Sequence, residues 1–186
     1  MRMRAAVLFE CGAKQPFAES RPLRIEEVDL DPPQEGEVLV KIGAAGLCHS
    51  DLSVINGDRP RPVPMVMGHE GAGEVVEVGR GVRDVKVGDH IVFQFSVSCG
   101  RCRRCLEGRP GICENAVRAR SAGELLGGGK RLHLAGQDLG HHSGVSCFAE
   151  YAVVDRGSVV VIDKSLPLDE AAIFGCAVMT GVGAVI

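Results

Sequence analysis

Four closely spaced cysteines are the feature of this sequence that is most specific for one chemistry. Two residues separate Cys99 from Cys102 and Cys102 from Cys105, and seven residues separate Cys105 from Cys113. Zinc binds four thiolates in a tetrahedron, and a two-residue spacer lets the backbone aim neighbouring sulfurs at one ion. Such a shell leaves no position for water, so we predict a structural zinc site in a lobe over residues 96–118. We expect four basic residues to offset the charge of the thiolates: Arg101, Arg103, Arg104 and Arg109.

Two local disulfides and an iron–sulfur cluster are the alternatives for the same thiols. Disulfides belong to oxidising compartments, and the N-terminal residues Met1–Leu8 carry no apolar run long enough for a signal peptide. We therefore expect a cytoplasmic protein, in which clustered cysteines favour metal binding. An iron–sulfur cluster also needs four thiolates, but the spacing matches neither of the common ferredoxin runs.

A second set of metal-binding side chains is scattered along the chain. Cys48, His69 and Cys176 lie in three separate pieces, Cys-His-Ser-Asp, Gly-His-Glu and Gly-Cys. A Cys₂His set with an open fourth position is a catalytic zinc pattern. Asp51 is the candidate acceptor for the free ring nitrogen of His69. Only a closed fold brings these pieces together, and taken singly each residue is more often a buried thiol or a satisfied core histidine.

The elements that must position these residues are mostly strands. Short β-branched runs alternate with glycine and proline, which predicts a mainly β barrel or sandwich with few short helices. Helical signals occur at 50–56, from Pro167 onward and near Thr180. We expect Gly123–Arg131, with its three consecutive glycines, to be a flexible loop. The strand candidates are 37–42, 73–79, 90–93, 148–154 and 158–162.

Charge and hydropathy narrow the classes of partner. The net charge of −3 provides no positive surface for nucleic acid. No apolar run reaches the roughly 18 residues of a membrane span. We therefore expect neither a nucleic acid nor a membrane as partner.

The order of these motifs resembles one family. Gly68-His69-Glu70-Gly71-Ala72-Gly73 is similar to the zinc signature of the medium-chain zinc-dependent alcohol dehydrogenases. The family order also matches: Cys-His-Ser-Asp, then Gly-His-Glu, then the cysteine lobe, then Gly-Cys. The resemblance covers the whole chain and is strongest to the branch of glutathione-dependent formaldehyde and aryl-alcohol dehydrogenases. It implies a GroES-like β-barrel and reversible oxidation of a small-molecule alcohol to an aldehyde or ketone, by hydride transfer to NAD or NADP.

The resemblance also implies a role for each motif residue. Cys48, His69 and Cys176 would bind the catalytic zinc, with Glu70 beside the metal, and the four lobe cysteines a second, structural zinc. Ser50 would contact the substrate oxygen and begin the proton relay. The remaining implied roles are cofactor contacts for His49 and Thr180, and substrate-pocket walls for Phe95 and His142. The oligomeric state stays open, with a homo-oligomer as one option.

Several residues carry a plainer interpretation. Ser53 stands where several family members have a histidine as outer proton carrier, so water or another group would have to serve. We favour a solvated loop pair over a catalytic role for His141 and His142. Cys11 and Cys147 match no zinc position and are expected to be ordinary thiols, and His90 and His133 structural or exposed histidines.

A dinucleotide fingerprint is missing from this sequence. In Gly181-Val182-Gly183-Ala184-Val185-Ile186, isoleucine stands where the third glycine of Gly-x-Gly-x-x-Gly belongs. In the family a Rossmann domain follows this point. We therefore expect residues 1–186 to form an incomplete catalytic domain, residues 180–186 to begin a linker helix, and the chain alone to bind zinc with little turnover.

Two other functions compete with the dehydrogenase. The first is a non-catalytic zinc-binding module of GroES-like fold, which needs only the Cys99–Cys113 site. The second is a zinc-free quinone reductase of the same superfamily, which would not need the metal ligands present here. Metal content discriminates among them.

Overall fold

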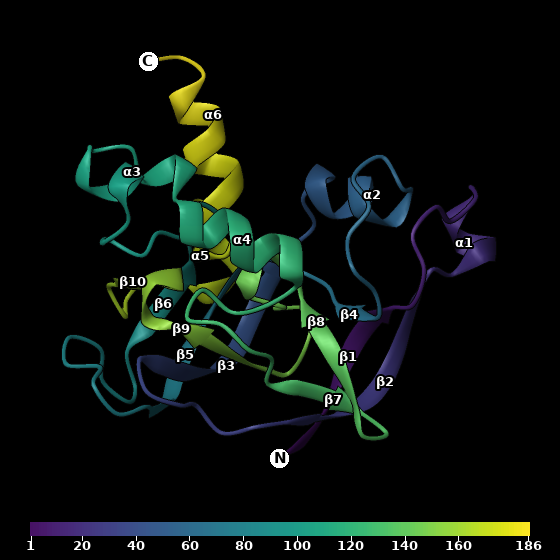
Figure 1. Cartoon of the computed structure of the whole chain (residues 1–186), viewed down its shortest axis with the longest axis horizontal. Helices are drawn as coiled ribbons and strands as arrows, with labels where there is room; N and C mark the ends of the chain where they lie inside the picture. Colours follow the sequence, from purple (N-terminus) through teal and green to yellow (C-terminus); the bar gives the residue numbers. More distant parts are fainter.

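The computed structural model describes residues 1–186 and is built mainly from strands. Figure 1 shows two sheets with most helices gathered on one side of them, at the top of the view. The first sheet closes into a barrel in the order β1-β2-β7-β8-β4. Its strands are β1 (Arg2–Leu8), β2 (Leu23–Leu30), β4 (Met65–Val66), β7 (Leu132–Leu134) and β8 (Gln137–His141).

The second sheet has the order β10-β6-β5-β3-β9, with every neighbouring pair antiparallel. The N-terminal half of β3, its longest strand, is buried on both faces, because β-branched and leucine side chains pack on either side. A bridge between Ala5 and Ala149 joins the two sheets. The strands are β3 (Glu37–Gly46), β5 (Glu70–Val78), β6 (His90–Phe93), β9 (Tyr151–Asp155) and β10 (Val159–Ile162).

The helices are short and sit in the connections. They are α1 (Phe17–Ser20), α2 (His49–Ile55), α3 (Arg103–Leu106), α4 (Glu114–Ala122), α5 (Leu168–Ala171) and α6 (Met179–Gly183). 3-10 turns occupy Pro110–Ile112, His142–Gly144 and Arg156–Ser158, and a π-helical turn covers Phe174–Val178. None of these helices combines the length and apolar character needed to cross a membrane.

The mainly β barrel expected from the sequence is confirmed, but three helices were missed, α1, α3 and α4, of which α4 is the longest. α4 directly follows the last lobe cysteine, and its residues Glu114 to Ala122 are mostly polar, with no clear apolar stripe. Ala116 and Ala119 are the only buried residues of this helix. A short helix that is anchored by its ends and two alanines leaves no periodic signal in the sequence.

The core consists of two main apolar clusters, one inside the barrel and one under the second sheet. The barrel cluster includes Val7, Val28 and Leu139, and the other includes Val40, Ile91 and Phe93. Leu125 joins the barrel core and is fully buried. The expectation of a flexible loop over Gly123–Arg131 is therefore wrong, because Leu125 and the side chain of Arg131 hold this segment against the core.

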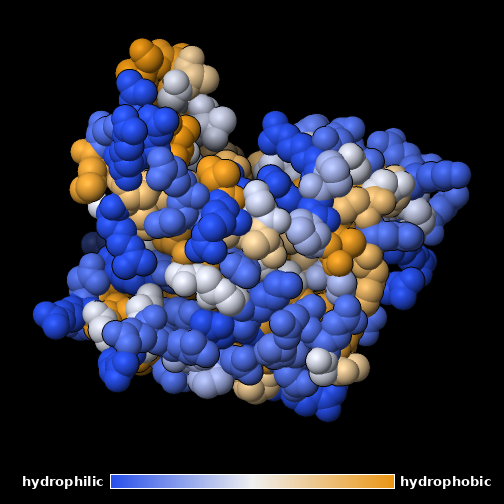
Figure 2. Space-filling view, in the orientation of Figure 1, coloured by the Kyte–Doolittle hydropathy of each residue, from blue (hydrophilic) through white to orange (hydrophobic).

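Apolar side chains are also exposed at the C-terminal end. Figure 2 shows orange atoms at the tip of α6, the uppermost part of the view. Val182, Val185 and Ile186 are among the exposed large apolar residues there. A groove between β6, β10 and the C-terminal turns continues this surface and is lined by Phe93, Phe174 and Met179 among others.

Candidate functional site

The four lobe cysteines meet at one point. Their sulfurs all lie within 4.8 Å of one another. Tetrahedral zinc with Zn–S bonds of ~2.3 Å separates its sulfurs by about 3.8 Å. The Sγ of Cys102 lies 3.5 Å from that of Cys105 and 3.8 Å from that of Cys113. The spacing of the thiols thus fits a closed Cys₄ zinc shell.

Backbone and amide N–H groups point at these sulfurs. Cys99 Sγ accepts hydrogen bonds from the Cys102 backbone N–H at 3.3 Å and from Asn115 Nδ2 at 3.2 Å. Cys113 Sγ accepts from Ala116 N and so caps α4. Burial opposes ionisation of Cys99, but these N–H donors outweigh it and lower its pKa to about 6. Asn115 was not foreseen, because an isolated asparagine gives no signal in a sequence.

All four lobe arginines were expected to offset the charge of the thiolates, but two of them form ion pairs with a carboxylate instead. Arg103 Nε donates to Glu107 Oε1 at 2.7 Å, and Arg104 Nη1 donates to Glu107 Oε2 at 3.2 Å. Carboxylates therefore engage these two guanidinium groups. The thiolates are instead supported by the short-range N–H donors.

The scattered set also comes together. The ligand atoms of Cys48, His69 and Cys176 lie within 4.8 Å of one another, and the two sulfurs are 3.6 Å apart. Figure 1 shows why: α2, which follows Cys48, and the α5–α6 segment, which contains Cys176, lie on the same side of the sheets. Three ligands at this spacing fit a zinc ion with one open position. Glu70 is not part of this set.

Gly68 positions His69 between β4 and β5. Its φ of +91° is left-handed, and a Cβ there would collide with Phe148. The backbone around it is fixed by the hydrogen bonds from Cys147 N to Gly68 O and from Phe148 N to Met67 O. The glycine before the histidine is thus a requirement of close packing.

Gly175 positions Cys176 by allowing a similarly close packing of the backbone. A Cβ at this position would collide with the carbonyl oxygen of Phe93, at the end of β6. Phe95 N donates to Gly175 O at 3.2 Å, which holds the π-helical turn onto the sheet. The Gly-Cys pair therefore brings the third ligand down against β6.

Asp51 joins two parts of this site. Its Oδ2 accepts from Cys48 N at 3.1 Å, and its Oδ1 lies 3.0 Å from Nδ1 of His69. Burial opposes ionisation of Asp51, but His142 and His69 beside it hold its pKa below the ordinary value. With its Nδ1 held by Asp51, the ring of His69 presents Nε2 to the two thiols.

Ser50, Phe95 and His142 line one small pocket next to this set. Ser50 Oγ donates to Cys48 Sγ at 3.2 Å and lies 3.4 Å from His69 Nε2. The rings of Phe95 and His142 lie with their centroids 4.9 and 5.3 Å from that of His69. The residues expected as pocket walls are therefore neighbours of the candidate ligands.

The interpretation of His141 and His142 as a solvated pair is wrong. They are 1% and 4% exposed. His141 Nε2 accepts from Arg131 N at 3.0 Å. Burial, followed by the charge of Arg131, lowers the pKa of His141 to about 3. Burial also lowers the pKa of His142, whose Nδ1 lies 3.0 Å from Asp51 Oδ1 but lacks hydrogen-bond geometry.

The other predicted residues are not among the three candidate ligands. Glu70 Oε1 accepts from Ala177 N at 2.9 Å, so its carboxylate supports the turn after Cys176. His49 and Thr180 are both exposed, at the start of α2 and in α6. Ser53 Oγ donates to His49 O at 3.1 Å. Cys147 is a buried core thiol, as expected.

The thiols of the two sets differ in pKa. Burial, and then the hydrogen bond to Cys48, raise the pKa of Cys176 to about 12. Burial and three neighbouring cysteines raise the pKa of Cys105 to about 12. Burial opposes ionisation of Cys48, but hydrogen bonds from Ser50 lower its pKa. A metal that binds to either set must therefore displace at least one proton.

The barrel and the two ligand sets together define a zinc-binding domain of GroES-like fold. The profile of the family described as "Alcohol dehydrogenase GroES-like domain" matches residues 34–164. The chain therefore belongs to this family, as its motifs predicted.

Known relatives agree with this assignment. The chain is 42% identical over 186 residues, all of its length, to an S-(hydroxymethyl)glutathione dehydrogenase from Synechocystis sp.. A crystal structure of an alcohol dehydrogenase zinc-binding domain protein from Burkholderia ambifaria matches all of the chain with a TM-score of 0.88 and 36% identity. Benzyl alcohol dehydrogenase from Acinetobacter calcoaceticus matches 99% of it with a TM-score of 0.85 and 32% identity.

The chain spans about half the length of these relatives. It covers 48% of the Synechocystis protein, 48% of the Burkholderia chain and 47% of the Acinetobacter chain. The two candidate zinc sites and the pocket nevertheless lie wholly within the matched half.

Proposed function

We propose that this chain is the catalytic domain of a zinc-dependent alcohol dehydrogenase. Its substrate would be a small-molecule alcohol, oxidised reversibly to an aldehyde or ketone, with NAD or NADP as hydride acceptor. The observation that carries the proposal is the meeting of Cys48, His69 and Cys176, from three distant segments, beside a pocket that contains Ser50.

In this proposal Cys48, His69 and Cys176 hold the catalytic zinc, and the four lobe cysteines hold a structural one. The bound zinc would supply Lewis-acid polarisation of the substrate oxygen. His69 and Asp51 keep the ligand geometry, because the carboxylate orients the imidazole from behind. A nicotinamide cofactor would supply the redox chemistry itself.

Ser50 is the proposed first carrier of the substrate proton. Its hydroxyl already lies within 3.4 Å of both Cys48 Sγ and His69 Nε2, next to the position that a substrate oxygen must occupy. Beyond it, Ser53 and His49 are in contact through the Ser53 hydroxyl. We assign the outer proton path to this pair and to solvent, since no histidine stands at position 53.

The remaining family roles are part of the same proposal. Glu70 would approach the metal when ligands exchange, and the exposed side chains of His49 and Thr180 would contact the cofactor. Phe95 and His142 would wall the substrate pocket. Residues 1–186 would form one GroES-like domain with the lobe at 96–118, and residues 180–186 would lead toward a cofactor-binding domain.

Metal analysis before and after mild chelation tests the two-site arrangement. We expect two zinc ions per chain, one of which exchanges readily because its shell has an open position. Cys176→Ser should lose the exchangeable ion and Cys105→Ser the tightly held one. Cys11→Ser is the matched control and should keep both, because Cys11 belongs to neither set.

Cobalt substitution tests whether the open site accepts a substrate. The visible spectrum of cobalt in the Cys48–His69–Cys176 site should change when an alcohol or aldehyde is added. The closed lobe site should contribute a constant background. One tightly held ion and a spectrum that no alcohol affects would instead support the non-catalytic zinc-binding module.

A further inference from the structure

Three arginines line the pocket beside the candidate catalytic zinc site. Arg59 and Arg61 lie in the loop after α2, and Arg120 lies near the end of α4. They share the pocket with Ser50, Phe95 and His142, with Val54 and Ser143 completing the wall. The pocket is small, with a cavity volume of about 40 Å³, and it is partly open to solvent. No acidic side chain is among its lining residues.

None of these three guanidinium groups has a carboxylate partner. Other arginines of the chain do pair, and the ion pairs involve Arg2, Arg4, Arg80, Arg103, Arg104, Arg118, Arg131 and Arg156. Asp51 does not line the pocket, and its Oδ1 lies 3.0 Å from a ring nitrogen of both His69 and His142. The pocket therefore has a surplus of positive charge that the protein itself does not neutralise.

Packing holds Arg120 in the pocket, close to Arg61. Arg120 is half-buried, with its guanidinium carbon 5.6 Å from the centroid of the Phe95 ring. Burial, followed by the charge of Arg61, lowers the pKa of Arg120, so the two guanidinium groups are near enough to repel each other. The buried His142 lies in the same wall, with its Nδ1 3.0 Å from Asp51 Oδ1. Like charges gathered without a counter-ion oppose folding unless an anion binds between them.

α4 links this arrangement to the zinc lobe. Cys113 caps the helix, Ala116 and Ala119 bury one side of it, and the helix packs against the turn that contains His142. The lobe therefore places Arg120 at the pocket. Arg59 differs, because it is exposed in the loop after α2.

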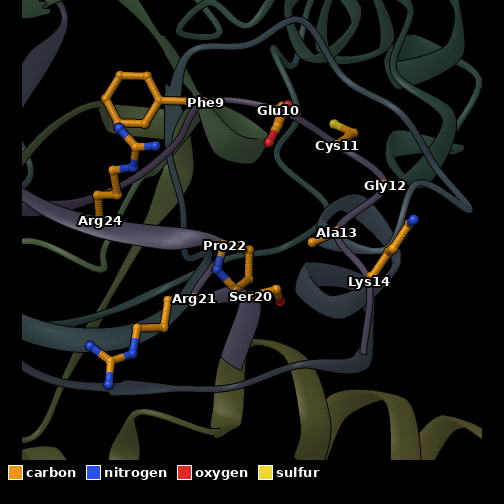
Figure 3. A pocket seen from close by; sticks show the side chains of 10 residues that line it. All are labelled: Phe9, Glu10, Cys11, Gly12, Ala13, Lys14, Ser20, Arg21, Pro22 and Arg24. Atoms are coloured by element: carbon orange, nitrogen blue, oxygen red, sulfur yellow. The ribbon is translucent and has the colours of Figure 1, made fainter. Parts of the chain in front are cut away.

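A second cavity with basic residues provides a contrast. Figure 3 shows it between residues 9–14 and 20–24, with Arg24 beside the ring of Phe9 and the side chains of Arg21 and Lys14 directed apart. Arg24 stacks on Phe9 at 5.1 Å, and Glu10 supplies a negative charge. No candidate metal ligand lines this cavity.

We propose that the substrate carries an oxyanion group, a carboxylate or a phosphate, in addition to the reacting hydroxyl or carbonyl, and that Arg59, Arg61 and Arg120 bind that group. The proposal rests on the proposed function of the neighbouring site. Guanidinium groups bind carboxylate and phosphate through paired N–H donors, and they do so most strongly where water is partly excluded. The anionic group would hold one end of the substrate, and Ser50 would contact the reacting hydroxyl or carbonyl at the other end.

A series of ω-hydroxyalkanoates of increasing chain length tests the proposal. Each member is compared with the 1-alkanol of the same length and with the ω-hydroxyalkyl phosphate, using the cobalt-substituted protein and its visible spectrum as the binding signal. We expect at least one anionic compound to bind about tenfold or more tightly than its neutral counterpart. The preference should weaken as salt is raised, and the tighter anionic series identifies carboxylate or phosphate.

Arginine variants assign the preference to residues. Arg120→Gln should reduce the affinity for the anionic probe about tenfold and leave that for the 1-alkanol unchanged. Arg59 and Arg61 lie in a loop, so Arg59→Gln and Arg61→Gln provide the same test if Arg120→Gln folds poorly. Arg118→Gln is the matched control, because Arg118 is an exposed arginine of the same helix that does not line the pocket.

The outcomes separate this inference from the proposed function. Equal affinity for hydroxyalkanoates, hydroxyalkyl phosphates and alkanols would overturn the inference alone, since alcohol binding would still support the dehydrogenase. A preference for anions that all three arginine variants retain would also overturn it. A spectrum that neither probe changes would refute the proposed function and the inference together.

Discussion

Several residues beside the two ligand sets act by positioning the ligand side chains. Asp51 is not one of the three proposed zinc ligands, yet its two oxygens hold the Cys48 backbone and the His69 ring. Asn115 supports a lobe thiol in a comparable way. The chemistry of the ligands therefore depends on residues whose own types are unremarkable.

Asp51→Asn should weaken zinc binding at the Cys48–His69–Cys176 site by about 10- to 100-fold. The amide retains the shape of the side chain but loses the charge that orients His69 and increases the basicity of its ring. Competition with a chromophoric chelator measures the affinity. Asp169→Asn, at an exposed position of α5, is the control and should bind zinc normally. Unchanged affinity in Asp51→Asn would show that the carboxylate does not support the ligand.

His141 makes the stability of the fold depend on pH. Its pKa is about 3 in the folded protein and near 6.5 when it is free of the fold. The unfolded chain therefore binds a proton that the folded chain rejects, and stability should fall as pH drops below about 6.5, by up to about 1.4 kcal/mol per unit. His141→Asn retains an acceptor for Arg131 N and should lose this slope. Urea unfolding in excess chelator, at several pH values, measures it.

His133 provides a control of opposite sign. Its hydrogen bond to Asp31, followed by that to Asp138, raises the pKa of His133. Its contribution should therefore be present below the unfolded value of about 6.5 and vanish as pH rises through the folded value. His133→Asn should lower stability most in acid, whereas His141→Asn should raise relative stability there. The same dependence in both variants would contradict the assignment.

At the scale of elements, a buried ion pair fixes the loop between α4 and β7. Arg131 Nη2 and Nε lie 2.7 and 3.0 Å from the two carboxylate oxygens of Glu37, at the start of β3. Both side chains are buried, and Arg131 also donates to Gln34 Oε1 and Lys130 O. This contact explains why a glycine-rich segment is packed onto the barrel.

Arg131→Met should destabilise the domain by about 3–5 kcal/mol, because it leaves the carboxylate of Glu37 buried without a partner. Chemical denaturation at neutral pH measures the loss. Replacing both residues, by Arg131→Met with Glu37→Leu, should recover much of the stability, because the buried charge is removed as well. Arg80→Gln, which breaks an exposed ion pair with Glu35, is the control and should have little effect. A small loss in Arg131→Met alone would mean that water reaches Glu37.

For the whole molecule, the two ligand sets differ in how much of the chain they connect. The lobe ligands all lie within residues 99–113, whereas the other set joins α2, the β4–β5 connection and the turn after α5. A ligand that binds only the folded state stabilises whatever must be folded to bind it. The two metals should therefore protect different parts of the structure.

Cys105→Ser should mainly increase amide hydrogen exchange in α3 and α4, with the strands still protected. Cys176→Ser should instead lower the thermal midpoint of the whole chain in the presence of zinc and increase exchange at the ends of β5 and β6. Hydrogen exchange followed by mass spectrometry resolves the two patterns. Identical patterns would show that the domain unfolds as one unit whichever metal is missing.

The sequence by itself determined the chemistry and the fold class. The Cys99–Cys113 spacing is local, so a short stretch of backbone suffices to specify four converging thiols. The β-branched runs gave the strands of the second sheet, because residue preferences for strands are also local. The strands of the closed barrel, β1, β2, β4, β7 and β8, were not among the candidates. Motif order gave the family and, by resemblance, the residues of the second set.

Only the tertiary structure decided which distant groups share a site. It brought Arg59, Arg61 and Arg120 into one pocket with Ser50, buried His141 and His142, and paired Arg131 with Glu37. Each of these depends on where α4 and the following loop pack, and their mostly polar sequence carries no periodic signal for that position. Contacts between residues far apart in sequence follow from closure of the whole barrel, which no local pattern encodes.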